Sequence, residues 1–173
     1  IGGIETSLAE TVRLLRRDFS ISILYHTRLP RVHTPILRDI PQYRFAPPYT
    51  SRAAVRQLTV LLKTIRPDIV HASNFPAYVI APFAATAAAV SVIITQRDTA
   101  EMPLIVRMLR EKTILANRLT HTIIAVSRAV ADLTRTFETG CAKKIVVLSN
   151  GTDTHRIHRL SRTQRTRTRA SFS

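Results

Sequence analysis

Short apolar segments alternate with amphipathic segments along most of the chain. Residues 51–65 have the 3.6-residue spacing of a helix, with Ser51 placed to cap its first turn, and residues 69–72 have the composition of a buried strand. The alternation also predicts strands at 21–25, 43–46, 91–95, 122–126 and 145–148, and helices at 4–17, 76–89, 100–119 and 127–138. Strands that alternate with helices predict an α/β fold, with a Rossmann-like parallel sheet and helices on both faces.

The pattern ends near residue 154. Residues 155–173 contain six arginines and no acidic residue, and arginine, threonine and serine together make up most of the segment. Such a segment buries too little apolar surface to offset its chain entropy. We therefore expect one domain at 1–154 and a disordered tail at 155–173, because 173 residues are too few for two ordinary domains.

The charge is strongly positive. Twenty-six Lys and Arg against 11 Asp and Glu give a net charge of +15, which attracts phosphates on nucleotides, nucleic acids or anionic lipids. A non-enzymatic basic module that binds nucleic acid or an anionic membrane is therefore one hypothesis. The aromatic content of 6%, with no tryptophan and no nucleic-acid-reading motif, makes nucleic acid the weaker of these partners.

Two features bear on the cellular environment. Residues 72–96 are uncharged and long enough to span a bilayer, but their prolines and polar residues favour a buried helix followed by a buried strand. Cys141 is the only cysteine, so no intramolecular disulfide is possible, which fits a reducing compartment. Its thiol is expected to be buried rather than reactive.

Several residues are candidates for chemistry, each with a structural alternative. Gly2-Gly3 precedes a helix, where backbone N–H groups can approach a phosphate, although a plain turn has the same sequence. His71 lies near the end of a strand, where open α/β sheets bind ligands, although a lone histidine in such a strand is more often hydrogen-bonded inside the core. Ser127 and Asn150-Gly151 are explained locally by a helix cap and a turn.

A metal site is not expected. His155 and His158 have a spacing that a metal can use on a helix, but a site needs further ligands and a rigid frame.

Taken in order, four motifs resemble glycosyltransferase family 4. They are Gly2-Gly3-Ile4-Glu5, Pro67-Asp68-Ile69-Val70-His71, Ile124-Ala125-Val126-Ser127 and Ser149-Asn150-Gly151-Thr152-Asp153. The resemblance implies the N-terminal, acceptor-side domain of a GT-B enzyme, in which a second Rossmann-like domain holds most donor contacts. It also implies hexosyl transfer from a nucleotide-sugar to a sugar or lipid-linked acceptor, with retention of configuration and no metal or other cofactor.

The resemblance also implies site residues. Catalytic positions are His71 and Arg97. Positions that contact donor phosphate or substrate are Gly2, Gly3, Glu5, Ser73, Asn74, Asp98, Ser127, Asn150, Gly151 and Asp153. Two positions depart from the family pattern, since Ser73 and Arg97 stand where histidines are frequent. Arginine can stabilise negative charge but is a poor base.

Location and completeness follow from the same resemblance. A cytoplasmic enzyme is expected, peripheral at the inner face of the membrane if the basic helix at 100–119 lies on anionic lipid. The pattern of that helix favours packing in the core with a solvated basic face. The family's first strand, ahead of Gly2-Gly3, and its C-terminal domain have no counterpart in the sequence. We therefore expect a chain truncated at both ends that is marginally stable and inactive alone.

Overall fold

The computed structural model describes residues 3–26, 37, 39–48, 51–73, 75, 77–97, 109–138 and 140–151. In chain order the elements are α1 (Gly3–Leu15), β1 (Ile23–His26), β2 (Gln42–Phe45), α2 (Arg52–Ile65), β3 (Ile69–Ser73), α3 (Ala77–Ala87), β4 (Val92–Arg97), α5 (Arg110–Leu119), β5 (Thr122–Ala125), α6 (Arg128–Phe137), a 3-10 turn (Ala142–Lys144) and β6 (Ile145–Val147). Helices and strands alternate as the sequence pattern predicts, which confirms the α/β fold class.

All strand pairs among the described residues are parallel, but the strands form two sheets. One sheet has the order β1-β2 and the other has the order β3-β4-β5-β6. The side of β1 away from β2 and the side of β3 away from β4 carry no ladder within the described part of the chain. The single sheet expected from the sequence is thus divided at this point.

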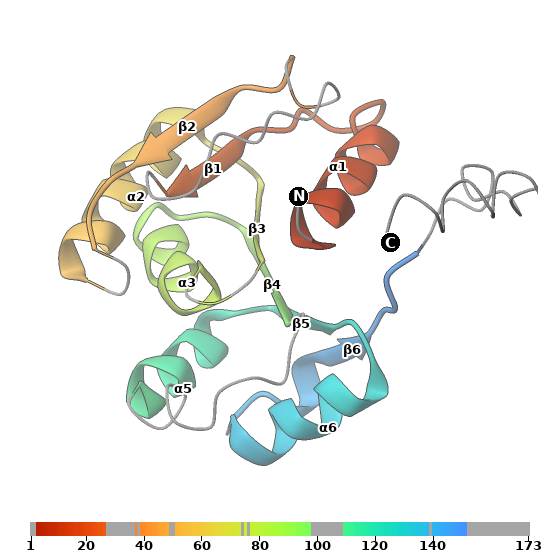
Figure 1. Ribbon diagram of the computed structural model, residues 1–173. Coiled ribbons are helices and arrows are strands. Elements are labelled where there is room, and N and C mark those ends of the chain that lie inside the picture. The colour runs from red at the N-terminus through yellow and green to blue at the C-terminus, as the bar shows by residue number, and fades with distance from the viewer. Residues whose placement is uncertain are drawn as a thin grey trace, which may run out of the picture.

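Helices lie on both sides of the larger sheet. Figure 1 shows α2 and α3 on one side of β3 and α1 on the other. The main core lies between α2, α3 and the strands, and it includes Leu58, Ala72, Val79 and Ile93. A second cluster joins α1 to β1 through Val12, Ile23 and Leu37. The prediction of helices on both faces is confirmed.

Local interactions explain where several helices begin and end. Ser51 accepts a hydrogen bond from the Ala54 N–H at 3.0 Å and caps α2, and Ser127 accepts one from the Val130 N–H at 3.2 Å and caps α6. The α2 helix ends at Arg66, which has a left-handed φ of 53°. Gly140, after α6, has a φ of 79°, a conformation that glycine adopts without steric cost.

Some expectations differ from the structure. The first strand lies two residues later than predicted at its start, and β4 continues to Arg97. The strand predicted to be buried, β3, is partly open: Ile69 is 44% exposed and His71 is exposed, whereas Ala72 is buried. Composition could not reveal this, because the exposure depends on what packs against that face of the sheet.

The uncharged run at 72–96 forms part of β3, the buried helix α3 and most of β4. No helix within the described ranges is long and apolar enough to cross a membrane. The described part of the basic helix, α5, packs against α3, as expected of a core-packing helix. The rest of that helix, at 100–108, and the tail at 155–173 lie outside the described residues.

Cys141 is fully buried, as expected, and its thiol donates to the Glu138 carbonyl at 2.8 Å. The described residues contain no group of three or more His, Cys, Asp or Glu side chains that could hold a metal ion. His155 and His158 lie outside the described residues.

Candidate functional site

The carboxyl ends of β3, β4, β5 and β6 lie at one edge of the larger sheet. Ser73 is opposite Gln96, Arg97 is opposite Ala125, and Ala125 is opposite Val147 in the parallel register. Beyond that row the Leu148 N–H donates to the Ala125 carbonyl at 2.9 Å, so β6 follows β5 past its end. We call this edge the carboxyl rim. In open α/β sheets, ligands bind beyond the carboxyl ends of the strands.

The carboxyl rim brings together part of the predicted site. Ser73 and Arg97 are the last residues of their strands, and Ser127 follows β5 by two residues. Asn150 and Gly151 are exposed and come three and four residues after the end of β6. Segments 73, 97 and 127 are far apart in sequence, so their meeting at one edge depends on the parallel sheet.

His71 lies two residues below the rim, in the middle of β3 and opposite Ile94. Because successive side chains point to opposite faces of a strand, His71 and Ser73 share one face, while Ala72 points into the main core. His71 is exposed, which excludes the alternative of a histidine enclosed in the core. An accessible imidazole can donate and accept hydrogen bonds with a sugar hydroxyl.

Ser127 has a structural role that the sequence predicts. Its hydroxyl caps α6, a ten-residue helix that begins three residues after the carboxyl end of β5. The free N–H groups and the positive dipole end of a helix favour an anion such as a phosphate. The cap interpretation is confirmed, and a substrate contact by Ser127 stays a prediction.

The remaining predicted site residues are described only in part or not at all. Gly3 is the first residue of α1, and Glu5 lies in its first turn. The structure gives the backbone of Glu5 and Arg97 but not the position of either side chain. Four predicted contacts lie outside the described residues: Gly2, Asn74, Asp98 and Asp153.

The sequence did not reveal several polar groups close to the strands. The Asn117 amide donates to the Glu138 carboxylate at 3.0 Å, and both residues are buried. The His121 ring accepts from the Ile93 N–H at 3.1 Å. Thr95, fully buried two residues before Arg97, has a hydroxyl with no hydrogen-bond partner among the described residues. The only sequence signal for Thr95 is a polar residue within an otherwise apolar strand.

A parallel sheet flanked by helices, with polar residues along its carboxyl rim, defines the chain as a Rossmann-like α/β domain. Several solved structures share this fold. The chain superposes on Anabaena Alr3699/HepE in complex with UDP-glucose with a TM-score of 0.76 and 21% identity, covering 99% of this chain and 46% of that one. The HepE complex with UDP gives a TM-score of 0.74. A glycosyltransferase from Rickettsia africae ESF-5 gives 0.66 at 16% identity, again with 99% and 46% coverage.

The family model for Glycosyltransferase Family 4 matches residues 1–156, and the chain belongs to that family. This confirms the resemblance seen in the four sequence motifs. The chain spans slightly less than half the length of the solved structures that it matches. Among curated protein sequences, none gives a significant match.

Proposed function

We propose that this chain is the acceptor-side domain of a glycosyltransferase that moves a hexose from a nucleotide-sugar to a sugar or lipid-linked acceptor, with retention of configuration. The family match over residues 1–156 is the observation that carries the proposal. The HepE structures, which contain UDP or UDP-glucose, support a uridine-diphosphate sugar as the donor. We further propose that the enzyme works in the cytoplasm, with the nucleotide-sugar as co-substrate and no metal or other cofactor.

In this proposal the acceptor binds against the carboxyl rim. The accessible His71 imidazole positions an acceptor hydroxyl by hydrogen bonding, and Ser73 adds a second polar group on the same face of β3. Arg97, at the end of the neighbouring strand, supplies positive charge where negative charge develops on the diphosphate. In this proposal Gly2 and Gly3, at the N-terminal end of α1, form the loop that faces the diphosphate.

The proposed acceptor site can be tested on this chain alone. Chemical-shift mapping by NMR with glucose and simple glucosides is expected to move the amide signals of Ser73, Ser127 and Asn150, because these residues border the rim. Amides on the outer face of α2, such as that of Arg56, serve as the internal control. Shifts spread evenly over the surface, or confined to α2, would refute the assignment of the rim.

A test of the proposed sugar transfer requires a donor domain. We propose that the isolated chain transfers no sugar, because most donor contacts belong to a second domain. A chimera with the C-terminal half of Anabaena HepE and radiolabelled UDP-glucose tests the roles of the residues. His71→Ala is expected to lower transfer at least tenfold, within the range that positioned acid–base groups contribute. The matched control, Arg56→Ala, alters an exposed residue on α2 and is expected to leave transfer unchanged.

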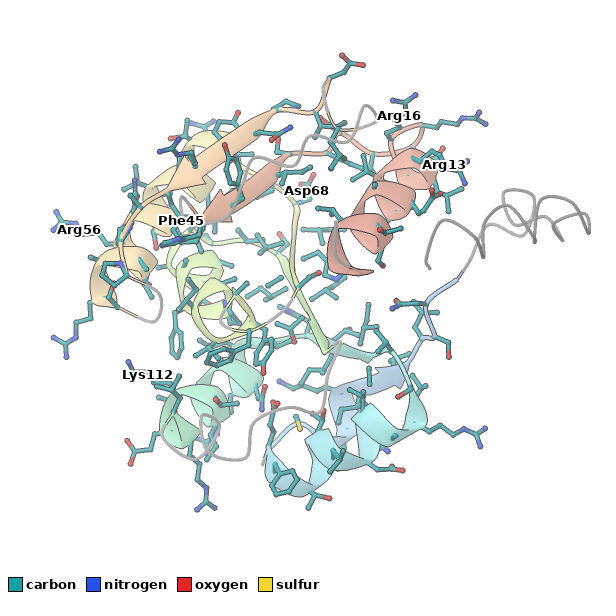
Figure 2. All side chains as sticks on the ribbon, in the orientation of Figure 1. Arg13, Arg16, Phe45, Arg56, Asp68 and Lys112 are labelled. Atoms are coloured by element: carbon teal, nitrogen blue, oxygen red, sulfur yellow. The ribbon has the colours of Figure 1, made fainter. Side chains whose placement is uncertain are left out.

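The positive net charge also supports a second candidate function, that of a basic module that contacts anionic lipid. Three exposed basic residues lie on one helix, α5, where they can contact anionic headgroups: Arg110, Lys112 and Arg118. Figure 2 shows Arg16, Arg56 and Lys112 on different parts of the periphery, which argues against a single phosphate-tracking groove. Co-sedimentation with phosphatidylserine vesicles, before and after deletion of residues 155–173, separates binding by the domain from binding by the tail.

A further inference from the structure

Strand β6 forms an unprotected edge of the larger sheet. Within the described residues it pairs only with β5, and its far side carries no ladder. The side chains of Val146, Val147 and Leu148 are 52%, 40% and 60% exposed, although all three are apolar. Natural proteins commonly protect an edge strand with a charged residue, a proline or a bulge. Residues 145–148 contain no charge and no proline, so this edge is a template for another strand.

The register with β5 shows which backbone groups of β6 are available. The Leu148 N–H donates to the Ala125 carbonyl at 2.9 Å, so the backbone of Leu148 is directed toward β5. Successive residues of a strand direct their N–H and carbonyl groups to opposite sides. Val146 is therefore also directed toward β5, whereas Ile145 and Val147 present their backbone groups at the open edge.

The sequence around Val147 is complementary to itself in the antiparallel direction. Lys143 and Lys144 precede the apolar residues, and the uncharged, exposed residues 149–151 follow them. In an antiparallel pair centred on Val147, each Lys144 lies opposite an uncharged asparagine, and Val146 lies opposite a leucine of the second copy. Such a pair opposes no like charges and brings exposed apolar side chains into contact. A parallel pair would place the lysines of both copies at the same end, so charge favours the antiparallel arrangement.

We propose that β6 pairs antiparallel with β6 of a second copy of this chain, about a two-fold axis at Val147. The two larger sheets then form one continuous sheet. Val147 exchanges both backbone hydrogen bonds with its counterpart, and Ile145 does the same with Ser149 of the second copy. A two-fold interface uses the same surface on both subunits, which is what a self-complementary edge provides. The inference does not depend on the proposed transferase activity.

A charge swap at the two-fold axis tests this pairing. Val147→Lys and Val147→Glu each place two like charges opposite one another, and the side chain is exposed enough to hold a charge in the monomer. The matched control is Ile69→Lys, which adds the same charge at a 44% exposed residue of β3, the outer strand at the other end of this sheet. Sedimentation velocity from low micromolar to millimolar concentration measures the dimer Kd, and circular dichroism verifies that each variant is folded.

The unmodified chain and Ile69→Lys are expected to dimerise with similar Kd. Either Val147 variant alone is expected to raise Kd by about tenfold or more, and an equimolar mixture of the two restores association, because lysine then faces glutamate. Added salt is expected to strengthen the unmodified dimer, since ions screen the repulsion between two chains of net charge +15. A chain that stays monomeric at millimolar concentration, a dimer that Val147→Lys leaves intact, or a mixture no tighter than the separate variants would overturn the proposal.

Amide exchange gives a second measurement that needs no variant. Hydrogen–deuterium exchange at the Ile145 and Val147 amides is expected to slow as the protein concentration rises. The Leu148 amide, which is already bonded to the Ala125 carbonyl, is the internal reference. Exchange at Val147 that is independent of concentration in a dimeric sample would assign the interface to another surface and overturn the proposal.

Discussion

The Lys144 side chain caps the C-terminal end of α5. Its replacement by methionine tests how much this cap stabilises the domain. The ammonium group donates to three carbonyls at the end of the helix, those of Asn117, Arg118 and Thr120, at 2.8, 2.8 and 2.7 Å. These carbonyls have no partner within the helix, and the positive charge sits at the negative end of the helix dipole. Lys144→Met removes the charge and all three bonds but keeps an unbranched side chain of similar length.

The expected loss of stability is smaller than the sum of three separate hydrogen-bond contributions. A hydrogen bond to a charged group contributes about 1.5–3 kcal/mol, but the three share one half-buried ammonium that water also solvates. Ordering the lysine side chain costs up to about 2 kcal/mol, and the dipole contributes about 0.3–1 kcal/mol. We therefore expect Lys144→Met to lower the free energy of unfolding by about 1–2 kcal/mol. For a chain of this length, that corresponds to a decrease in Tm of about 2–8 °C.

The neighbouring residue provides the control. Lys143 is exposed and has no side-chain hydrogen bond among the described residues, so Lys143→Met removes the same charge without removing a cap. On a chain with a net charge of +15, losing one positive charge relieves repulsion equally in both variants. Urea unfolding followed by circular dichroism gives both free energies. Equal stability of the two variants would refute the capping argument.

Three further changes are expected to have defined effects on urea unfolding. Ser51→Ala removes the cap of α2 and is expected to cost about 1 kcal/mol; a change below about 0.3 kcal/mol would show that Ala54 finds another acceptor. Gly140→Ala is expected to cost about 1 kcal/mol through backbone strain alone, since φ is 79° and nothing lies within 4 Å of an added Cβ; an unchanged midpoint would contradict this. Thr95→Val removes a buried hydroxyl without a partner among the described residues and is expected to be neutral or stabilising by up to about 1 kcal/mol; destabilisation would reveal a bond to that hydroxyl.

The features that the sequence predicted correctly depend on residues near one another in the chain. Ser51 and Ser127 each cap a helix through an N–H three residues away, so both helix starts could be predicted from local sequence. The gathering of Ser73 and Arg97 at one edge also followed from the pattern, because parallel strands end on the same side of a sheet.

The features that the sequence missed depend on distant contacts. Lys144 binds carbonyls 24 to 27 residues earlier, and no local pattern marks it as a cap. Ile69 has the composition of a buried strand residue but is 44% exposed, because its burial depends on what packs against its face of the sheet. The roles of His71 and Arg97 came from the family resemblance, since neither residue type identifies a reaction by itself.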